Sequence, residues 1–175
     1  MKKFPVLSLI LIVACSSYAL GHAQSESSIT NIRRQYAAIN KRTSRFKKVK
    51  KELSGFSLEG GQLIVYFDGP AIVKLVATHY GEMGRTSEEY YYLDGKLIFV
   101  FEKVSHYNKP MSGKVVRTVE NRYYFDNDQM IRWLDQNQKQ GDSTGEEFRS
   151  KQKDLLETSN LFVAGARSKT PAIEK

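Results

Sequence analysis

The stretch EEYYYLDGKLIFVFEKV, residues 88–104, decides the fold of this chain. It contains two runs rich in Tyr, Val, Ile and Phe, which favour β-strands, and Asp94-Gly95 joins them. Because Asp-Gly accepts the positive φ angles of a type I′ turn, the two runs are predicted to pair as an antiparallel hairpin. We therefore expect strands over residues 88–93 and 96–104.

Two similar hairpins flank this one. Each has two apolar runs joined by an Asp-containing turn: residues 63–78 turning at 68–70, and residues 115–134 turning at 126–128. Three hairpins in succession predict a six-stranded antiparallel meander, and their unequal spacing argues against a solenoid or propeller. The longer connections at residues 80–87 and 105–113 are the expected functional loops, since loops on a rigid sheet commonly carry binding groups.

Residues 28–53 precede the meander and have a helical pattern with an expected break near Thr43-Ser44. Their apolar residues are spaced by three, four and seven: Ile29, Ile32, Tyr36, Ile39, Phe46, Val49 and Leu53. The other face is strongly basic: Arg33, Arg34, Lys41, Arg42, Arg45, Lys47, Lys48, Lys50 and Lys51. Such a helix packs on the sheet with a solvated cationic face, or it lies on an anionic membrane or docks an acidic partner.

The remaining segments complete the predicted organisation. Residues 135–145 are a polar linker, residues 146–164 have the pattern of a second amphipathic helix, and residues 165–175 are expected to be a disordered tail. The predicted fold class is α+β. An N-terminal amphipathic helix packs on a six-stranded antiparallel β-meander within a domain of residues 28–134, and a C-terminal helix is added to it.

The N-terminus has the features of an export signal. Lys2 and Lys3 precede an apolar run at residues 4–14, within the usual 7–15 residues of a secretory signal and too short to span a bilayer. Small residues at 21 and 23 favour cleavage after Ala23, which makes residues 1–23 a signal peptide and the protein periplasmic or secreted. The alternative is lipidation of Cys15, because Ile-Val-Ala-Cys resembles a bacterial lipobox. Cys15 would then anchor the protein to a membrane.

Composition excludes several classes of protein. Cys15 is the one cysteine, so a disulfide framework, a zinc finger and an iron–sulfur site are excluded. The net charge is +8, and an exported basic protein is expected to meet anionic envelope surfaces or acidic partners and no nucleic acid. Two histidines remain after the predicted cleavage, His79 and His106, without metal-ligand spacing. We therefore predict no metal, no cofactor and no catalytic residues.

Tyrosine is the unusual feature of the predicted sheet. Alternation places Tyr90 and Tyr92 on one face of their strand, with Tyr91 on the other, and divides Tyr123 from Tyr124 in the same way. If one face is open, it carries a binding platform for an envelope protein, a peptide or a glycan: Tyr90, Tyr92, Tyr123, Arg132 and Trp133. In the alternative interpretation, the rings pack against a helix while each hydroxyl reaches water.

Part of the chain resembles a known group. Residues 88–100, with residues 120–127 and 131–135, resemble small exported bacterial proteins that contain a domain of unknown function with repeated Tyr-Tyr-x-Asp-Gly/Asn hairpins. The resemblance implies the compartment and the fold, and it transfers no catalytic residue.

The sequence thus predicts an exported cell-envelope protein that acts as a non-catalytic binding or structural module. One alternative is a small periplasmic hydrolase that uses Glu88, Glu102 and His106, with the two carboxylates facing each other across the middle hairpin. Cross-strand pairing with basic residues is the simpler role for these carboxylates. Another alternative is an inhibitor or immunity-type protein that docks an acidic partner through its basic helix.

Overall fold

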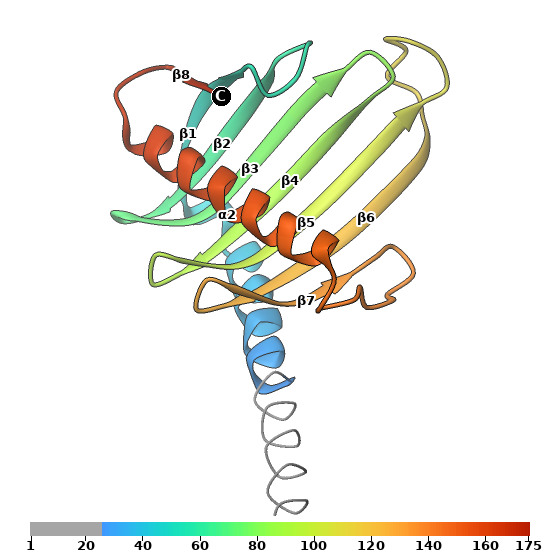
Figure 1. Ribbon diagram of the computed structural model, residues 1–175. Coiled ribbons are helices and arrows are strands. Elements are labelled where there is room, and N and C mark those ends of the chain that lie inside the picture. Colours follow the sequence, from blue (N-terminus) through green and yellow to red (C-terminus); the bar gives the residue numbers. More distant parts are fainter. Residues whose placement is uncertain (1–25) are drawn as a thin grey trace, which may run out of the picture.

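The computed structural model describes residues 26–175, so the predicted signal peptide and Cys15 lie outside the described residues. One large sheet has a helix on each face (Figure 1). The helices are the segment at residues 26–41, the short 3-10 helix η1 (Thr43–Arg45) and α2 (Glu146–Arg167). The strands are β1 (Lys47–Ser54), β2 (Gly61–Asp68), β3 (Ala71–Gly81), β4 (Gly84–Leu93), β5 (Lys96–Tyr107), β6 (Val115–Asp126), β7 (Gln129–Leu134) and β8 (Ala172–Glu174).

The predicted meander is present as strands β2 to β7, each antiparallel to the next. The β4–β5 turn has positive φ at both central residues, 51° at Asp94 and 78° at Gly95, as a type I′ turn requires. The β6–β7 turn repeats this geometry with φ of 50° at Asn127 and 61° at Asp128. The mixed α+β class with a large antiparallel sheet is therefore confirmed.

The sheet has eight strands, in the order β7-β6-β5-β4-β3-β2-β1-β8, so the prediction of six strands is wrong. The predicted helix over residues 28–53 ends at residue 41, and its second half is strand β1. Alternate residues Val49, Lys51 and Leu53 face the core there, a two-residue period that the apolar spacing had concealed. The basic residues 47–51 consequently lie on a strand and divide between its two faces.

The predicted disordered tail is also wrong, because residues 172–174 form β8, parallel to β1. Ile173 is buried against α2, and a Cβ on Gly165 would stand 2.4 Å from its Cδ1 atom, so only glycine permits this contact. Lys51 donates from Nζ to the carbonyl oxygens of Ser168, at 2.9 Å, and Thr170. Lys51 thereby satisfies carbonyls just beyond the C-terminus of α2.

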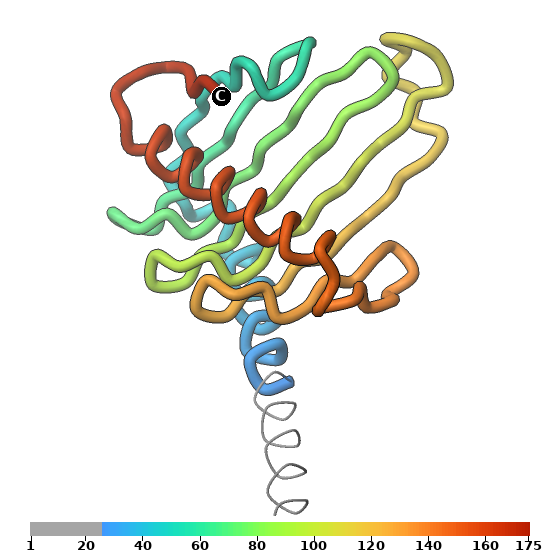
Figure 2. Tube along the Cα trace, viewed as in Figure 1, coloured from blue at the N-terminus to red at the C-terminus, as the bar shows by residue number. Residues whose placement is uncertain are grey.

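The two helices cover opposite faces of the sheet (Figures 1 and 2). We call the face under α2 the front face and the face under the helix at residues 26–41 the back face. The front core includes Leu75, Tyr90, Tyr92, Val100, Tyr123, Phe148, Leu155 and Phe162. The back core includes Ile29, Ile32, Ile39, Tyr91, Phe99 and Tyr124. The central strands β4, β5 and β6 therefore bury residues on both of their faces.

One end of the sheet is less covered than the other. The β1–β2, β3–β4 and β5–β6 connections lie together at the upper end in Figure 1, which we call the apical end. The helix at residues 26–41 packs near the opposite end. No helix in residues 26–175 is long and apolar enough to cross a membrane.

Candidate binding cleft

The predicted tyrosine platform is not exposed. Tyr90 and Tyr123 are 0% exposed and Tyr92 is 4% exposed, because α2 lies across this face of the sheet. Phe162 of α2 packs edge-on to Tyr90 at 5.6 Å between ring centroids, and Ser159 Oγ lies 2.7 Å from the Tyr92 hydroxyl. The predicted alternation of the tyrosines is correct, but their face is covered by α2, so the platform that required an open face is not formed.

The other two predicted platform residues do not join a common surface either. Trp133 lies on the front face, where its ring packs 5.4 Å from that of Tyr123 and Nε1 donates to Asn121 Oδ1 at 3.2 Å. Arg132 is the next residue along β7 and points to the back face, where it pairs with Glu26 of the N-terminal helix. Sequence neighbours on a strand point to opposite faces, so these two side chains are separated by the sheet.

The carboxylates of the hydrolase alternative are register partners across β4 and β5, as predicted. Glu102 is buried and fully engaged: Asn121 and the Tyr123 hydroxyl donate to Oε2 at 2.8 and 3.0 Å, and Lys151 Nζ lies 3.1 Å from Oε1. His106 is four residues further along β5, roughly 13 Å away. Glu102 and His106 therefore do not meet, and the structure does not assemble the predicted triad.

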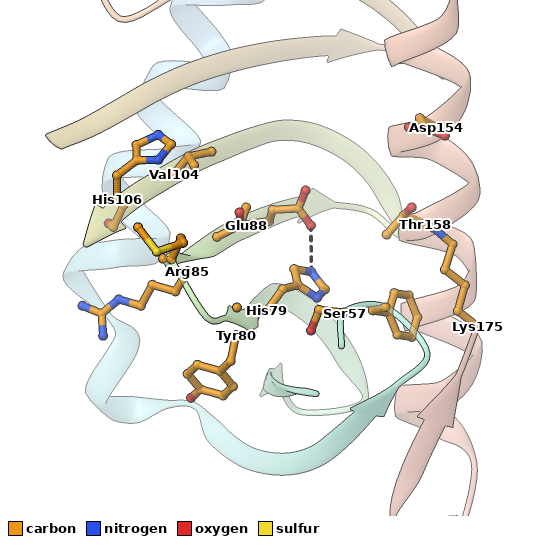
Figure 3. Close-up of a pocket in the computed structure, with 16 residues that line it drawn as sticks. Ser57, His79, Tyr80, Arg85, Glu88, Val104, His106, Asp154, Thr158 and Lys175 are labelled. Carbon is orange, nitrogen blue, oxygen red and sulfur yellow. Dashed lines mark hydrogen bonds and ion pairs between the residues drawn. The ribbon is translucent and has the colours of Figure 1, made fainter. Parts of the chain in front are cut away.

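A cleft of about 540 Å³ lies at the apical end of the front face, where α2 leaves the strands (Figure 3). His79 of β3 and Glu88 of β4 form its floor, with 3.4 Å between Nε2 and Oε2. The Tyr90 hydroxyl donates to the same Oε2 at 3.0 Å. Nδ1 of His79 is buried without a hydrogen-bond partner among the described residues. The imidazole thus lines the cleft while one of its nitrogens is buried and unsatisfied by the described residues.

The walls of the cleft come from distant parts of the chain. Phe56, in the β1–β2 connection, packs 5.8 Å from the His79 ring, and Thr158 and Asp154 descend from α2 (Figure 3). His106 and Lys175 complete the lining and add nitrogen donors. The lining therefore combines an aromatic wall with hydrogen-bonding groups of both kinds.

Burial and nearby carboxylates raise the pKa values of two tyrosines in the front core. Burial, with the negative charge of Glu88, raises the pKa of Tyr90 well above its ordinary value, and burial with Glu102 does the same to the pKa of Tyr123. Both hydroxyls therefore remain protonated donors near neutral pH, which fixes the two carboxylates as acceptors.

The arrangement can bind a polar group. Within residues 26–175 no three His, Cys, Asp or Glu side chains are grouped to hold a metal ion. The sequence had indicated His79, His106 and Glu88 at or near the ends of strands. It gave no signal for Phe56, Asp154 or Lys175, because only the crossing of α2 and the pairing of β8 bring them to this place.

No family model, curated protein or solved structure matches this chain.

Proposed function

We propose that this chain is an exported, non-catalytic binding module of the cell envelope and that the apical cleft is its ligand site. The observation that carries the proposal is the His79–Glu88 pair. It is a largely buried polar pair that faces a cavity, whereas the neighbouring Glu102 is enclosed by protein donors. A largely buried polar pair that lines a cavity favours a ligand with polar groups that hydrogen-bond to the pair.

The lining favours a saccharide among the ligands expected of an envelope protein. Phe56 adds apolar surface to the lining, with Lys175 Nζ 5.9 Å from its ring centroid, and Glu88 and His79 offer an acceptor and a donor or acceptor for adjacent sugar hydroxyls. Thr158 and Asp154 of α2 add further hydrogen-bonding groups to the lining. The cleft is open, so the ligand is proposed to be a short segment of a longer glycan.

Titration of the isotope-labelled protein with soluble chitooligosaccharides and peptidoglycan fragments, followed by NMR, tests the site. We expect shifts confined to Phe56, His79, Glu88 and Thr158, and at least tenfold weaker binding for Glu88→Gln and His79→Gln. The matched control is Glu157→Gln, at an exposed position of α2. Shifts elsewhere, binding of peptides alone, or unchanged affinity in both cleft variants would overturn this assignment.

The export part of the proposal has its own test. The full chain, expressed in a bacterial host and recovered from the envelope, is expected to have the intact mass of a protein that begins at Gln24. A lipidated start at Cys15 would place it on a membrane instead. Retention of Met1 in the recovered protein would contradict export with processing.

A further inference from the structure

Exposed apolar side chains gather at the apical end of the sheet. Apart from Tyr36, every exposed large hydrophobic side chain within residues 26–175 lies there: Leu58, Tyr80, Met83, Met111, Val115 and Val116. Met111, Val116 and Met83 are 68%, 61% and 51% exposed. We call Met83, Met111, Val115 and Val116 the apical patch. Several exposed apolar side chains at one end of a sheet favour an interaction site there.

The apical patch is held in place by backbone hydrogen bonds between two connections. The Met111 amide donates to the Glu82 carbonyl at 2.8 Å, and the Tyr107 amide donates to the Met83 carbonyl at 2.8 Å. These bonds fix the β5–β6 connection against the β3–β4 turn, so the side chains of the patch are presented together. The register shift opposite Val116 adds a β-bulge, which re-aims a side chain at a sheet rim.

Met111 has an unfavourable backbone conformation for its type. Its φ is 53°, in the left-handed region that glycine, asparagine and aspartate usually occupy. A turn explains this φ angle: the Ser112 amide donates to the Lys109 carbonyl at 3.3 Å, and Met111 follows Pro110 at the third position, where a type II turn has a positive φ. The turn thus presents the Met111 side chain, which is 68% exposed, to solvent in the β5–β6 connection.

The surroundings of the patch are basic. Arg85, Lys109, Lys114 and Arg117 flank it, with Glu82 as the acidic residue between them. None of these four cations lies in an ion pair within the described part of the chain. A lipid bilayer has an apolar interior beneath its headgroups, and anionic lipids add negative charge at the headgroup level. Apolar side chains surrounded by unpaired Lys and Arg are complementary to such a surface.

We propose that the apical patch docks on an anionic lipid bilayer, with Met83 and Met111 entering the headgroup boundary and Lys109 and Lys114 contacting lipid phosphates. The basic residues at 47–51, which the sequence had suggested for this role, lie on strand β1 instead. The cleft opens beside the patch and shares Met83 with it, so docking would bring the cleft close to the membrane surface. The two sites remain separable, because Met111, Lys109 and Lys114 do not line the cleft.

Sedimentation of the mature protein with vesicles tests the proposal. We expect retention at low salt on phosphatidylglycerol-containing vesicles, little retention on pure phosphatidylcholine, and loss at high salt. Lys109→Gln with Lys114→Gln should weaken binding by about 25-fold, about fivefold for each charge near an anionic surface. Met111→Ser should also weaken it, and Met111→Trp should give a blue-shifted emission on binding.

The matched control carries Lys153→Gln and Lys169→Gln, which remove the same charge from exposed positions outside the patch. The control should lose far less vesicle binding than the patch variant, and no more than its reduced net charge explains. Equal losses in the two double variants, or no retention of the unaltered protein at low salt, would overturn the proposal. Patch-dependent capture of an acidic protein without any vesicle binding would overturn it as well and assign the surface to a protein partner.

Discussion

Two neighbouring Glu–Tyr pairs on β4 have opposite environments. On the back face, the Glu89 carboxylate lies 2.7 Å from Lys74 Nζ and accepts a hydrogen bond from the Tyr91 hydroxyl. Asn40 of the N-terminal helix accepts from Lys74 Nζ at 3.0 Å, and its Oδ1 lies 3.1 Å from the Tyr91 hydroxyl oxygen. On the front face, Glu88 has the Tyr90 hydroxyl and His79 as partners, and His79 faces a cleft.

The difference shows how one sequence pattern acquires two roles. The back network joins permanent charges and ties a helix to the sheet, so its groups are satisfied by the fold itself. In the front network, the imidazole of His79 replaces the ammonium of Lys74. In the described part of the chain, no side chain of a covering helix bonds to this network as Asn40 does on the back face. The front network therefore retains capacity for a partner from outside the protein. The back network is structural, and the front network is the one available for binding.

The largest expected effect is a loss of stability of both cores at alkaline pH. Burial raises the pKa of Tyr90, Tyr92 and Tyr123 in the front core and that of Tyr91 in the back core. The unfolded chain ionises these groups first, so stability is fully present below about pH 10 and falls above it. The expected loss is about 1.4 kcal/mol per pH unit for each tyrosine, roughly 5 kcal/mol for the four together.

Urea unfolding measured at intervals between pH 9 and pH 11 checks this expectation. Tyr92→Phe should flatten the dependence, and Tyr80→Phe, at an exposed position, should leave it unchanged. A free energy of unfolding that stays constant over this range would show that the tyrosines ionise without unfolding either core.

Removing the aromatic anchor of α2 should have the next largest effect. Phe162 is fully buried and packs against Phe56 at 5.3 Å as well as Tyr90 and His79. Phe162→Ala is expected to lower the free energy of unfolding by about 3–5 kcal/mol, measured by urea denaturation. Lys153→Ala, exposed on the same helix, should change it by less than about 0.5 kcal/mol. A loss below 1 kcal/mol for Phe162→Ala would mean that α2 does not seal the front face.

Lys74→Met tests the structural role of the back network. The change leaves the partly buried Glu89 carboxylate without its cation, and we expect a loss of about 2–3 kcal/mol in thermal or urea unfolding. Adding Glu89→Leu should recover part of this loss, since no charge is then left unpaired. Lys48→Met, an exposed lysine on the same face, is the control. A loss in Lys74→Met no greater than in that control would remove the distinction between the faces.

The smallest effect on the free energy of unfolding is expected at His79, which takes the place of Lys74 in the front network. His79→Gln retains a donor for Glu88 and should cost less than about 1 kcal/mol in the same unfolding measurement, while it weakens ligand binding. A cost as large as that of Lys74→Met would show that His79 is structural, and the comparison between the two networks would fail.

The meander could be predicted because its signals are local. Each turn has its own residues, such as Asp94-Gly95, and each flanking run consists of β-forming residues. Strand β1 was mistaken for a helix because Phe46, Val49 and Leu53 fit a helical spacing as well as an extended one. Pairing with β2, a tertiary interaction, decides between the two. Three-residue β8 has too few residues to give any pattern.

The site was only partly predictable for the same reason. Strand alternation correctly divided Tyr90 from Tyr91, since it depends only on the two-residue period. Which face lies open depends on where α2 crosses, and no local pattern states that. His79 and Glu88 could be placed near strand ends, but their contact comes from the register of β3 against β4.

Parallel pairing of β8 with β1 has a consequence for how this chain assembles. Residues 172–174 pair with residues 52–54 alone, so this part of the β1 edge stays open until those residues are available, and residues 47–51 have no strand on that side among the described residues. An open edge is a template for pairing with another molecule. Shortened chains that end before Pro171 would expose residues 52–54 of this edge as well, and we expect them to associate through β1 more readily than the full chain.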